Sequence, residues 1–161
     1  MEMVYIALGS NLGDREENLK NAYDHIIGSE KIQPGKFSRF YETVPVGGPP
    51  QPMFLNAVLE MQTSMEPHQL LEELQRIELL MGRIRGEKWG PRIIDLDILL
   101  FGDRIVEDDT LKIPHPFMHE RMFVLEPLVE IAPHMVHPVL KKKILQMYQE
   151  LKNLNQQGLQ K

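Results

Sequence analysis

The order of apolar and polar patterns along the chain predicts an α+β fold with a layered α/β/α architecture. Three observations support it: short apolar runs typical of strands, two strong helical stripes between them, and further helical patterns near the C-terminal end. The resulting order is strand, helix, strand, strand, helix, strand, which is the β-α-β-β-α-β order of a ferredoxin-like core. Helices packed on such a sheet, with additional C-terminal helices, would form a layered domain.

The size and composition of the chain are those of one globular domain. It has 161 residues, of which 42% are hydrophobic and 25% are charged, so a single core is large enough to be stable. We therefore expect one domain over residues 1–161, with a frayed tail at residues 155–161.

Charge and residue content exclude several classes of protein. The net charge is −5, whereas general binders of nucleic acids or anionic membranes are usually basic, so we expect neither partner. The absence of cysteine excludes disulfides, thiolate metal sites and cysteine nucleophiles. The apolar run at residues 4–8 is too short for a signal peptide or a membrane span. We expect a cytoplasmic protein and take a monomer as the default.

The N-terminal region predicts a strand followed by a helix. Residues 4–8 form the strand pattern, and the apolar stripe from Leu19 to Ile27 forms the helical one. The turn between them lacks both the dinucleotide-binding and the P-loop glycine patterns, so we interpret it as structural. The candidate caps of the helix are Ser10, Asn11 and Asp14.

A proline-rich loop separates the next two strands. The second strand is expected within residues 36–43 and the third at residues 54–63. Between them, residues 44–52 contain four prolines and two glycines, which predicts no regular structure. A plain linker would fit this composition, but a long loop inside a compact domain is more often functional, so we interpret it as a flap over a site.

The middle of the chain predicts a long helix, a basic loop and a strand that carries two aspartates. The helical stripe covers residues 66–81 and Gly82 ends it. The basic loop occupies residues 82–91, and the aspartate strand follows at residues 93–100. A short edge strand is expected at residues 104–106.

The C-terminal region is expected to be mainly helical. Residues 110–123 form a loop that runs into a helix, and residues 122–131 predict a short helix interrupted near Pro127. Residues 138–151 predict a terminal amphipathic helix.

The aspartate strand carries the most informative chemical pattern. Strand side chains alternate between faces, so Asp95 and Asp97 share a face, with Cα atoms about 7 Å apart. Carboxylates in apolar surroundings are tolerated when they are paired or bind a metal, and Mg²⁺ prefers a few carboxylates with waters and phosphates. Leu99 and Phe101 are expected to continue this face, which fits a solvated face poorly. Just upstream of the aspartates lie four cations suited to a polyphosphate: Arg83, Arg85, Lys88 and Arg92.

Each feature also has a structural interpretation. A D-x-D pair is common on solvated strands, and a basic loop is usually a solvated loop. Phe54 and Phe123 could be core residues, which is the better interpretation of either phenylalanine alone. Trp89 could pack its loop, and His115 could be a turn histidine. The combination of loop, turn and paired aspartates is more specific than any single part.

Motifs along the chain match one known family. The most specific joins a basic residue, a Gly-Pro-Arg turn and the D-x-D pair, here Lys88, Gly90, Pro91, Arg92, Asp95 and Asp97. Further matches lie at residues 7–13, 51–56, 75–83 and 114–123. On these motifs the chain resembles the 6-hydroxymethyl-7,8-dihydropterin pyrophosphokinase family, over almost all residues up to about 138.

The resemblance implies a ferredoxin-like α/β/α fold and a Mg-dependent pyrophosphokinase of folate biosynthesis. It implies transfer of pyrophosphate from ATP, the co-substrate, to the hydroxymethyl group of 6-hydroxymethyl-7,8-dihydropterin, with release of AMP. Two Mg²⁺ ions would be held by Asp95 and Asp97, and Asp97 would also orient or deprotonate the attacking hydroxyl. Arg83 and Arg92 would close over the phosphates as catalytic residues. The implied pterin-binding residues are Thr43, Val46, Phe54, Asn56, Asp95 and Phe123. The implied ATP-binding residues are Gln75, Glu78, Arg85, Lys88, Trp89, Arg92, Ile98, His115 and Arg121.

The chain departs from some relatives at three places. Pro116 stands where some carry an aromatic residue, the loop at residues 83–91 is shorter than in some, and Phe54 stands where tyrosine also occurs. These departures concern adenine contacts and loop closure rather than the reaction.

Two other functions fit parts of the pattern. One is a catalytically silent ferredoxin-like module that binds a nucleotide or pterin, and the intact arginines and aspartates argue against it. The other is a nucleic-acid enzyme with D-x-D metals, and the acidic charge balance argues against that.

Overall fold

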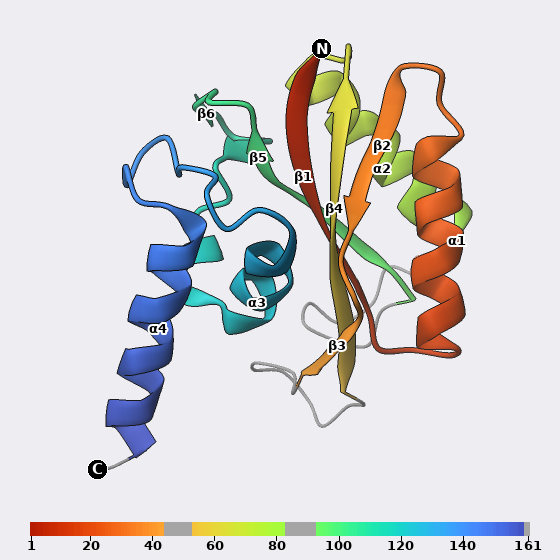
Figure 1. Ribbon diagram of the computed structural model, residues 1–161. Coiled ribbons are helices and arrows are strands. Elements are labelled where there is room, and N and C mark those ends of the chain that lie inside the picture. The colour runs from red at the N-terminus through yellow and green to blue at the C-terminus, as the bar shows by residue number, and fades with distance from the viewer. Residues whose placement is uncertain (44–52, 83–92, 160–161) are drawn as a thin grey trace.

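A computed structural model describes residues 1–43, 53–82 and 93–159, and its elements follow the predicted order (Figure 1). The strands are β1 (Glu2–Ser10), β2 (Ile32–Phe37), β3 (Tyr41–Thr43), β4 (Phe54–Thr63), β5 (Asp95–Phe101), β6 (Val106–Glu107) and β7 (Lys112–Ile113). The helices are α1 (Arg15–Ile27), α2 (Pro67–Leu80), α3 (Met122–Ile131) and α4 (Ile144–Leu159), with a 3-10 turn, η1, at Met118–Glu120.

The main sheet has the strand order β2-β4-β1-β5, and the short β3 pairs with β4 beyond this path. All of its strand pairs are antiparallel. Strands β1, β2, β4 and β5 with helices α1 and α2 reproduce the β-α-β-β-α-β core, so the ferredoxin-like prediction is confirmed.

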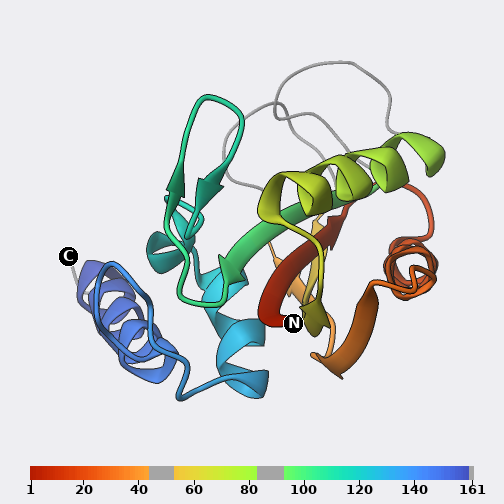
Figure 2. The same cartoon turned by 90° about the horizontal axis from the view of Figure 1, so that it is seen from above.

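Helices cover both faces of this sheet. Helices α1 and α2 pack on one face, and α3 and α4 pack on the other (Figure 2). The first core cluster includes Leu19 of α1 and Leu74 of α2, and the second includes Leu125 of α3 and Ile144 of α4.

Strand β5 places both aspartates on the α3 face. Asp95 pairs with Gly9 of β1 and Asp97 pairs with Ala7, and Ala7 packs against the second core cluster. Because directly paired residues point to the same side of a sheet, the prediction that the two carboxylates share a face is confirmed.

The prediction that Phe101 continues the aspartate face is wrong, because β5 contains a bulge. Tyr5 of β1 pairs with Leu100, but the next residue of β1 pairs with Ile98, so Leu99 is an extra residue on β5. After this bulge the alternation is reversed. Leu99 and Leu100 both join the second core cluster, and Phe101 joins the first.

The second predicted strand is two strands in the structure. Strand β2 starts at Ile32, before the expected residues 36–43, and β3 is separate. The early start is hidden in the sequence by Pro34 and Gly35, which resemble a turn. The chain tolerates proline here because β2 is an edge strand. Gly35 is needed because a Cβ atom there would lie 2.9 Å from the carbonyl oxygen of Glu60.

The C-terminal helices also differ from the prediction. Helix α3 runs unbroken through Pro127, although a proline at this position leaves the Phe123 carbonyl without its helical donor. Helix α4 starts at Ile144 rather than at residue 138, and it extends to Leu159. The expected edge strand at residues 104–106 is the hairpin of β6 and β7 instead. Among the helices that the structure describes, none is long and apolar enough to cross a membrane.

Candidate active site

The floor of the candidate site is a row of paired residues across four strands. Tyr41 of β3 pairs with Asn56 of β4, Asn56 pairs with Gly9 of β1, and Gly9 pairs with Asp95 of β5. All four positions therefore face α3. Residues from four separate parts of the sequence are brought together in this row.

Gly9 is required by the close approach of its neighbours. A Cβ atom on Gly9 would lie 3.0 Å from Asn56 Oδ1 and 3.6 Å from Phe54 Cδ1. The absence of a side chain lets the Asn56 amide and the Phe54 ring lie over β1. This residue was not predicted as a site residue, and the only signal for it was its place in the motif at residues 7–13.

Thr43 and Asn56 form a polar pair at one side of the floor. Asn56 is only 8% exposed, and its Nδ2 donates a hydrogen bond of 2.6 Å to Thr43 Oγ1. The hydrogen bond fixes the orientation of the amide. Thr43, which the resemblance implies as a pterin-binding residue, is thus joined through its side chain to Asn56, another implied pterin-binding residue.

The two aspartates lie beside this pair at the start of β5. Asp95 is half-buried and Asp97 is exposed. Their neighbours on β1 are glycine and alanine, which leave room above the sheet. Within residues 1–43, 53–82 and 93–159, no group of three or more His, Asp or Glu side chains is placed to hold a metal ion by itself. Two carboxylates still suit Mg²⁺, because this ion is usually bound by one or two carboxylates with waters and substrate phosphates.

Glu78 of α2 supports the aspartate strand directly. Its side chain is buried, with 5% of the residue exposed, and its Oε2 accepts a hydrogen bond of 2.9 Å from the Leu96 N–H. Leu96 lies between Asp95 and Asp97, so this carboxylate anchors the edge strand at the aspartates. Gln75, one helical turn earlier, is exposed. The structure thus gives Glu78 a contact with β5 that the prediction of an ATP ligand did not include.

A cavity of about 320 Å³ lies beside β5 and brings Asp97, Ile98 and His115 together. Its far wall is the β6–β7 hairpin and the connection between the two strands, including Asp108 and Lys112. A larger hollow of about 490 Å³ lies between α2 and the turn after α1, and no predicted site residue lines it. We therefore place the candidate nucleotide side in the smaller cavity.

His115 is held as a neutral imidazole with a defined tautomer. Its backbone N–H donates to the Leu99 carbonyl, at the β5 bulge, and its Nδ1 accepts a hydrogen bond of 3.2 Å from the Phe117 N–H. Burial, and secondly the charge of Arg121, lowers the pKa of His115 to about 4. The ring is neutral at pH 7, and with Nδ1 as acceptor the proton is on Nε2. His115 can therefore donate a hydrogen bond to a phosphate.

Arg121 lies between two aromatic rings. Its guanidinium carbon is 5.4 Å from the centroid of Phe117 and 5.6 Å from that of Phe123. Both distances are within the range of a cation–π contact. Phe117 was missed in the sequence analysis, where only the missing aromatic residue at Pro116 was noted. The signal for Phe117 in the sequence was its position, one residue after Pro116 and four residues before Arg121.

Arg15 is another residue that the sequence did not point to. Its Nη1 donates to the Met53 carbonyl at 2.8 Å, and its Nη2 binds Glu42 Oε2 at 2.6 Å. Glu42 lies just before residues 44–52, and Met53 follows them directly. One arginine at the start of α1 thus joins both ends of the segment predicted as a flap.

Six predicted site residues lie outside the described part of the chain. They are Val46, Arg83, Arg85, Lys88, Trp89 and Arg92.

Comparison with known proteins identifies the family of the chain. The model of the 7,8-dihydro-6-hydroxymethylpterin-pyrophosphokinase (HPPK) family matches residues 5–133. The chain belongs to this family. The family resemblance drawn from the sequence motifs is thus confirmed.

Individual members of the HPPK family align over most of the chain. The 2-amino-4-hydroxy-6-hydroxymethyldihydropteridine pyrophosphokinase of Bacillus subtilis is 50% identical over 130 residues, which cover 81% of this chain and 78% of that protein. The Haemophilus influenzae enzyme of the same name is 46% identical over 138 residues, 86% of each chain. The folic acid synthesis protein fol1 of Pneumocystis carinii is 44% identical over 150 residues, 93% of this chain but 20% of fol1.

The fold is also similar to that of a solved HPPK structure whose sequence identity to this chain is low. Plasmodium falciparum HPPK-DHPS with pteroate has a TM-score of 0.72 at 18% identity, over 92% of this chain. The chain spans less than half of that protein, 43% of its length. At this identity the similarity shows the HPPK fold alone.

Proposed function

We propose that the chain transfers pyrophosphate from ATP to the hydroxymethyl group of 6-hydroxymethyl-7,8-dihydropterin, yielding the pterin diphosphate and AMP, in folate biosynthesis. The family match over residues 5–133 carries this proposal. The geometry agrees with it, because the hydrogen-bonded pair of Thr43 and Asn56 lies across Gly9 from Asp95, and a cavity lies beside Asp97. Two substrates can meet at the aspartates from these two sides.

The pterin is proposed to bind over the floor row. Phe54 and Phe123 supply flat faces for a planar heterocycle, and such stacks contribute roughly 0.5–1.5 kcal/mol beyond burial. Asn56, oriented by Thr43, binds the polar edge of the ring. Asp95 and the backbone of Val46 complete the proposed pterin-binding set.

ATP is proposed to bind in the cavity beside β5. Ile98 lies in its wall, and His115 donates from Nε2 to the phosphates. The other residues proposed for the nucleotide are Gln75, Glu78, Arg85, Lys88, Trp89, Arg92 and Arg121.

Asp95 and Asp97 are proposed to hold two Mg²⁺ ions together with phosphate oxygens. When bound, such ions neutralise phosphate charge and stabilise the attacking and leaving oxygens. Asp97 orients the hydroxyl of the pterin and receives its proton as the oxygen bonds to the β-phosphorus of ATP. AMP leaves with the bridging oxygen, while Arg83 and Arg92 neutralise charge on the transferred group.

One assay tests the reaction. The chain is incubated with ATP, Mg²⁺ and 6-hydroxymethyl-7,8-dihydropterin, and the nucleotide products are separated. AMP that depends on the pterin, with no ADP, is the expected result, and omission of pterin or addition of EDTA is expected to abolish it. A chain that binds both substrates without forming AMP would instead be the silent binding module.

The remaining expectations stay predictions. They are a single domain over residues 1–161, a monomer in the cytoplasm, and no nucleic-acid or membrane partner. Light scattering after size exclusion would test the monomer.

A further inference from the structure

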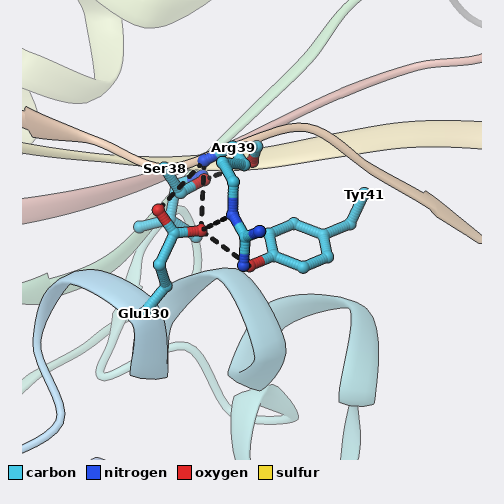
Figure 3. Close-up of polar contacts among 5 residues, drawn as sticks. Ser38, Arg39, Tyr41 and Glu130 are labelled. Carbon is cyan, nitrogen blue, oxygen red and sulfur yellow. Dashed lines mark hydrogen bonds and ion pairs between the residues drawn. The ribbon is translucent and has the colours of Figure 1, made fainter.

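Several donors converge on the carboxylate of Glu130, near the end of α3 (Figure 3). The backbone N–H of Arg39 donates to both oxygens, at 3.1 and 3.2 Å, and the Tyr41 hydroxyl donates to Oε1 at 2.6 Å. The Arg39 side chain adds a longer contact from Nε at 3.4 Å and donates to the Tyr41 oxygen at 3.2 Å. We call this group the Glu130 clamp.

The sheet side of the clamp is rigid. Arg39 lies in the short connection between β2 and β3, and the preceding Ser38 is fixed to β4. The Ser38 N–H donates to the Val58 carbonyl at 3.0 Å, and Ser38 Oγ accepts from the Val58 N–H at 2.9 Å. Ser38 Oγ also donates to the Arg39 carbonyl at 2.8 Å. These bonds to β4 therefore hold the Arg39 N–H, which donates to Glu130, in a fixed position.

The backbone donor and the tyrosine carry the clamp, rather than the arginine side chain. The Arg39 side chain is 79% exposed, and exposed ion pairs contribute little. The Glu130 side chain is 27% exposed, so its bonds to the Arg39 N–H and to Tyr41 are better shielded. Burial, and secondly the bond to Glu130, raises the pKa of Tyr41, so its phenol stays protonated as a donor.

The clamp connects α3 and β3, which both carry residues of the proposed pterin site. On α3, Phe123 and Glu130 are seven positions apart, about two turns, and so project from nearly the same face of the helix. On β3, Tyr41 and Thr43 are two positions apart and share a face of the strand. Glu130 binds Tyr41, which is a member of the floor row, and Phe123 of the proposed pterin site lies on the same face of α3 two turns earlier.

We propose that Glu130 is a positioning residue for the pterin, because it fixes the distance and rotation of α3 relative to β3. Helix α3 also packs on the described part of the sheet through apolar residues such as Leu125 and Leu128, and apolar contacts are not directional. Strand β3 has three residues and pairs only with β4 among the described strands. The clamp supplies the directional contacts that set the gap between Phe123 and the Phe54–Asn56 floor. This inference depends on the proposed pterin site.

Steady-state kinetics of two clamp variants test the inference. Glu130→Gln removes the charge while keeping the side-chain size, and Tyr41→Phe removes one hydroxyl group. Glu126→Gln is the matched control, because it removes the same charge one turn earlier on α3, outside the clamp. The Michaelis constants for pterin and for ATP are measured separately, together with the melting temperature.

The expected result is a roughly three- to tenfold higher KM for the pterin in Glu130→Gln, with the KM for ATP within about twofold of wild type. Tyr41→Phe is expected to raise the pterin KM less than Glu130→Gln does. In the double variant, the increase in pterin KM is expected to be smaller than the product of the two single increases, because Glu130 and Tyr41 share one contact. A role in stability alone would lower the melting temperature without separating the two KM values. If Glu130→Gln does not fold, Tyr41→Phe decides.

The outcomes separate the two claims. If wild type is active and both clamp variants have the same pterin KM as Glu126→Gln, the positioning role is overturned. The proposed function is then left intact. Wild type that neither binds the pterin nor forms AMP overturns both.

Discussion

The imidazole of His115 is expected to make the stability of the fold depend on pH. Its pKa is about 4 in the folded chain, against the ordinary value of 6.5, mainly because the ring is buried. As pH falls from 6.5 to 4, the unfolded chain takes up a proton that the folded chain does not. The free energy of unfolding therefore decreases as pH falls through this window. The contribution of the neutral ring to stability is fully present above pH 6.5. The gap between the two pKa values sets an upper limit of about 3 kcal/mol.

The variant His115→Asn isolates this contribution. Asparagine does not titrate, and its Oδ1 can take the place of Nδ1 as acceptor for the Phe117 N–H, which lies 3.2 Å from it. Between pH 7 and pH 4.5, wild type is expected to lose about 2 kcal/mol more than the variant. In a chain of this size that corresponds to about 4–8 °C in melting temperature. Urea unfolding at several pH values measures the difference, and only the pH slope matters.

A second histidine provides the control. Burial, and secondly the charge of His119, also lowers the pKa of His137, whose Nδ1 accepts from the Val139 and Leu140 N–H groups. His137→Asn is expected to remove a separate part of the slope, since the two rings are far apart in the sequence and have different partners. Parallel loss of stability in wild type and His115→Asn over the whole range would refute the reasoning.

Three further substitutions test the site. Asp97→Ala is expected to abolish formation of AMP while the melting temperature is kept, because one of two mutually repelling carboxylates is removed; loss of folding would show a structural pair. Gly9→Ala is expected to raise the pterin KM severalfold at unchanged ATP KM, since its Cβ would lie 3.0 Å from Asn56 Oδ1, and an unaltered pterin KM would contradict this. Phe117→Ala is expected to raise the ATP KM about two- to fivefold, because Arg121 loses one ring worth about 0.5–1 kcal/mol. Phe117→Tyr, which keeps a ring, is the control for that experiment.

The sequence was sufficient for the core topology because its patterns are local. The α2 stripe Leu70, Leu74 and Ile77 is fully buried, and the Asp14 side chain caps α1 through the Glu17 N–H. The shared face of Asp95 and Asp97 also followed from local alternation. Each of these features depends on residues that are close in the chain, where the period of the element determines which side chains are buried.

The features that the sequence did not reveal depend on contacts between distant segments. Gly9 matters only because Asn56 lies opposite it, and Glu130 matters only because Arg39 and Tyr41 meet it across the interface of α3 and the sheet. The early start of β2 at Ile32 likewise depends on β4, since pairing with a neighbour outweighs the low strand propensity of proline and glycine. Such pairings have no periodic signal along one segment.

The bulge in β5 shows how one strand serves both the core and the site. Before Leu99, the α3 face of the strand carries the two carboxylates. From Leu99 on, two consecutive leucines fill the core beneath α3 and α4. The carbonyl of Leu99 also accepts the His115 N–H, at 3.0 Å, so the irregularity that ends the site half of the strand also positions a residue of the nucleotide cavity. A regular strand would have placed Phe101 on the α3 face and left the first core cluster without its ring. The bulge therefore allows dense packing to begin immediately after the aspartates, which gives the carboxylates a rigid base while Asp95 is half-buried and Asp97 is exposed.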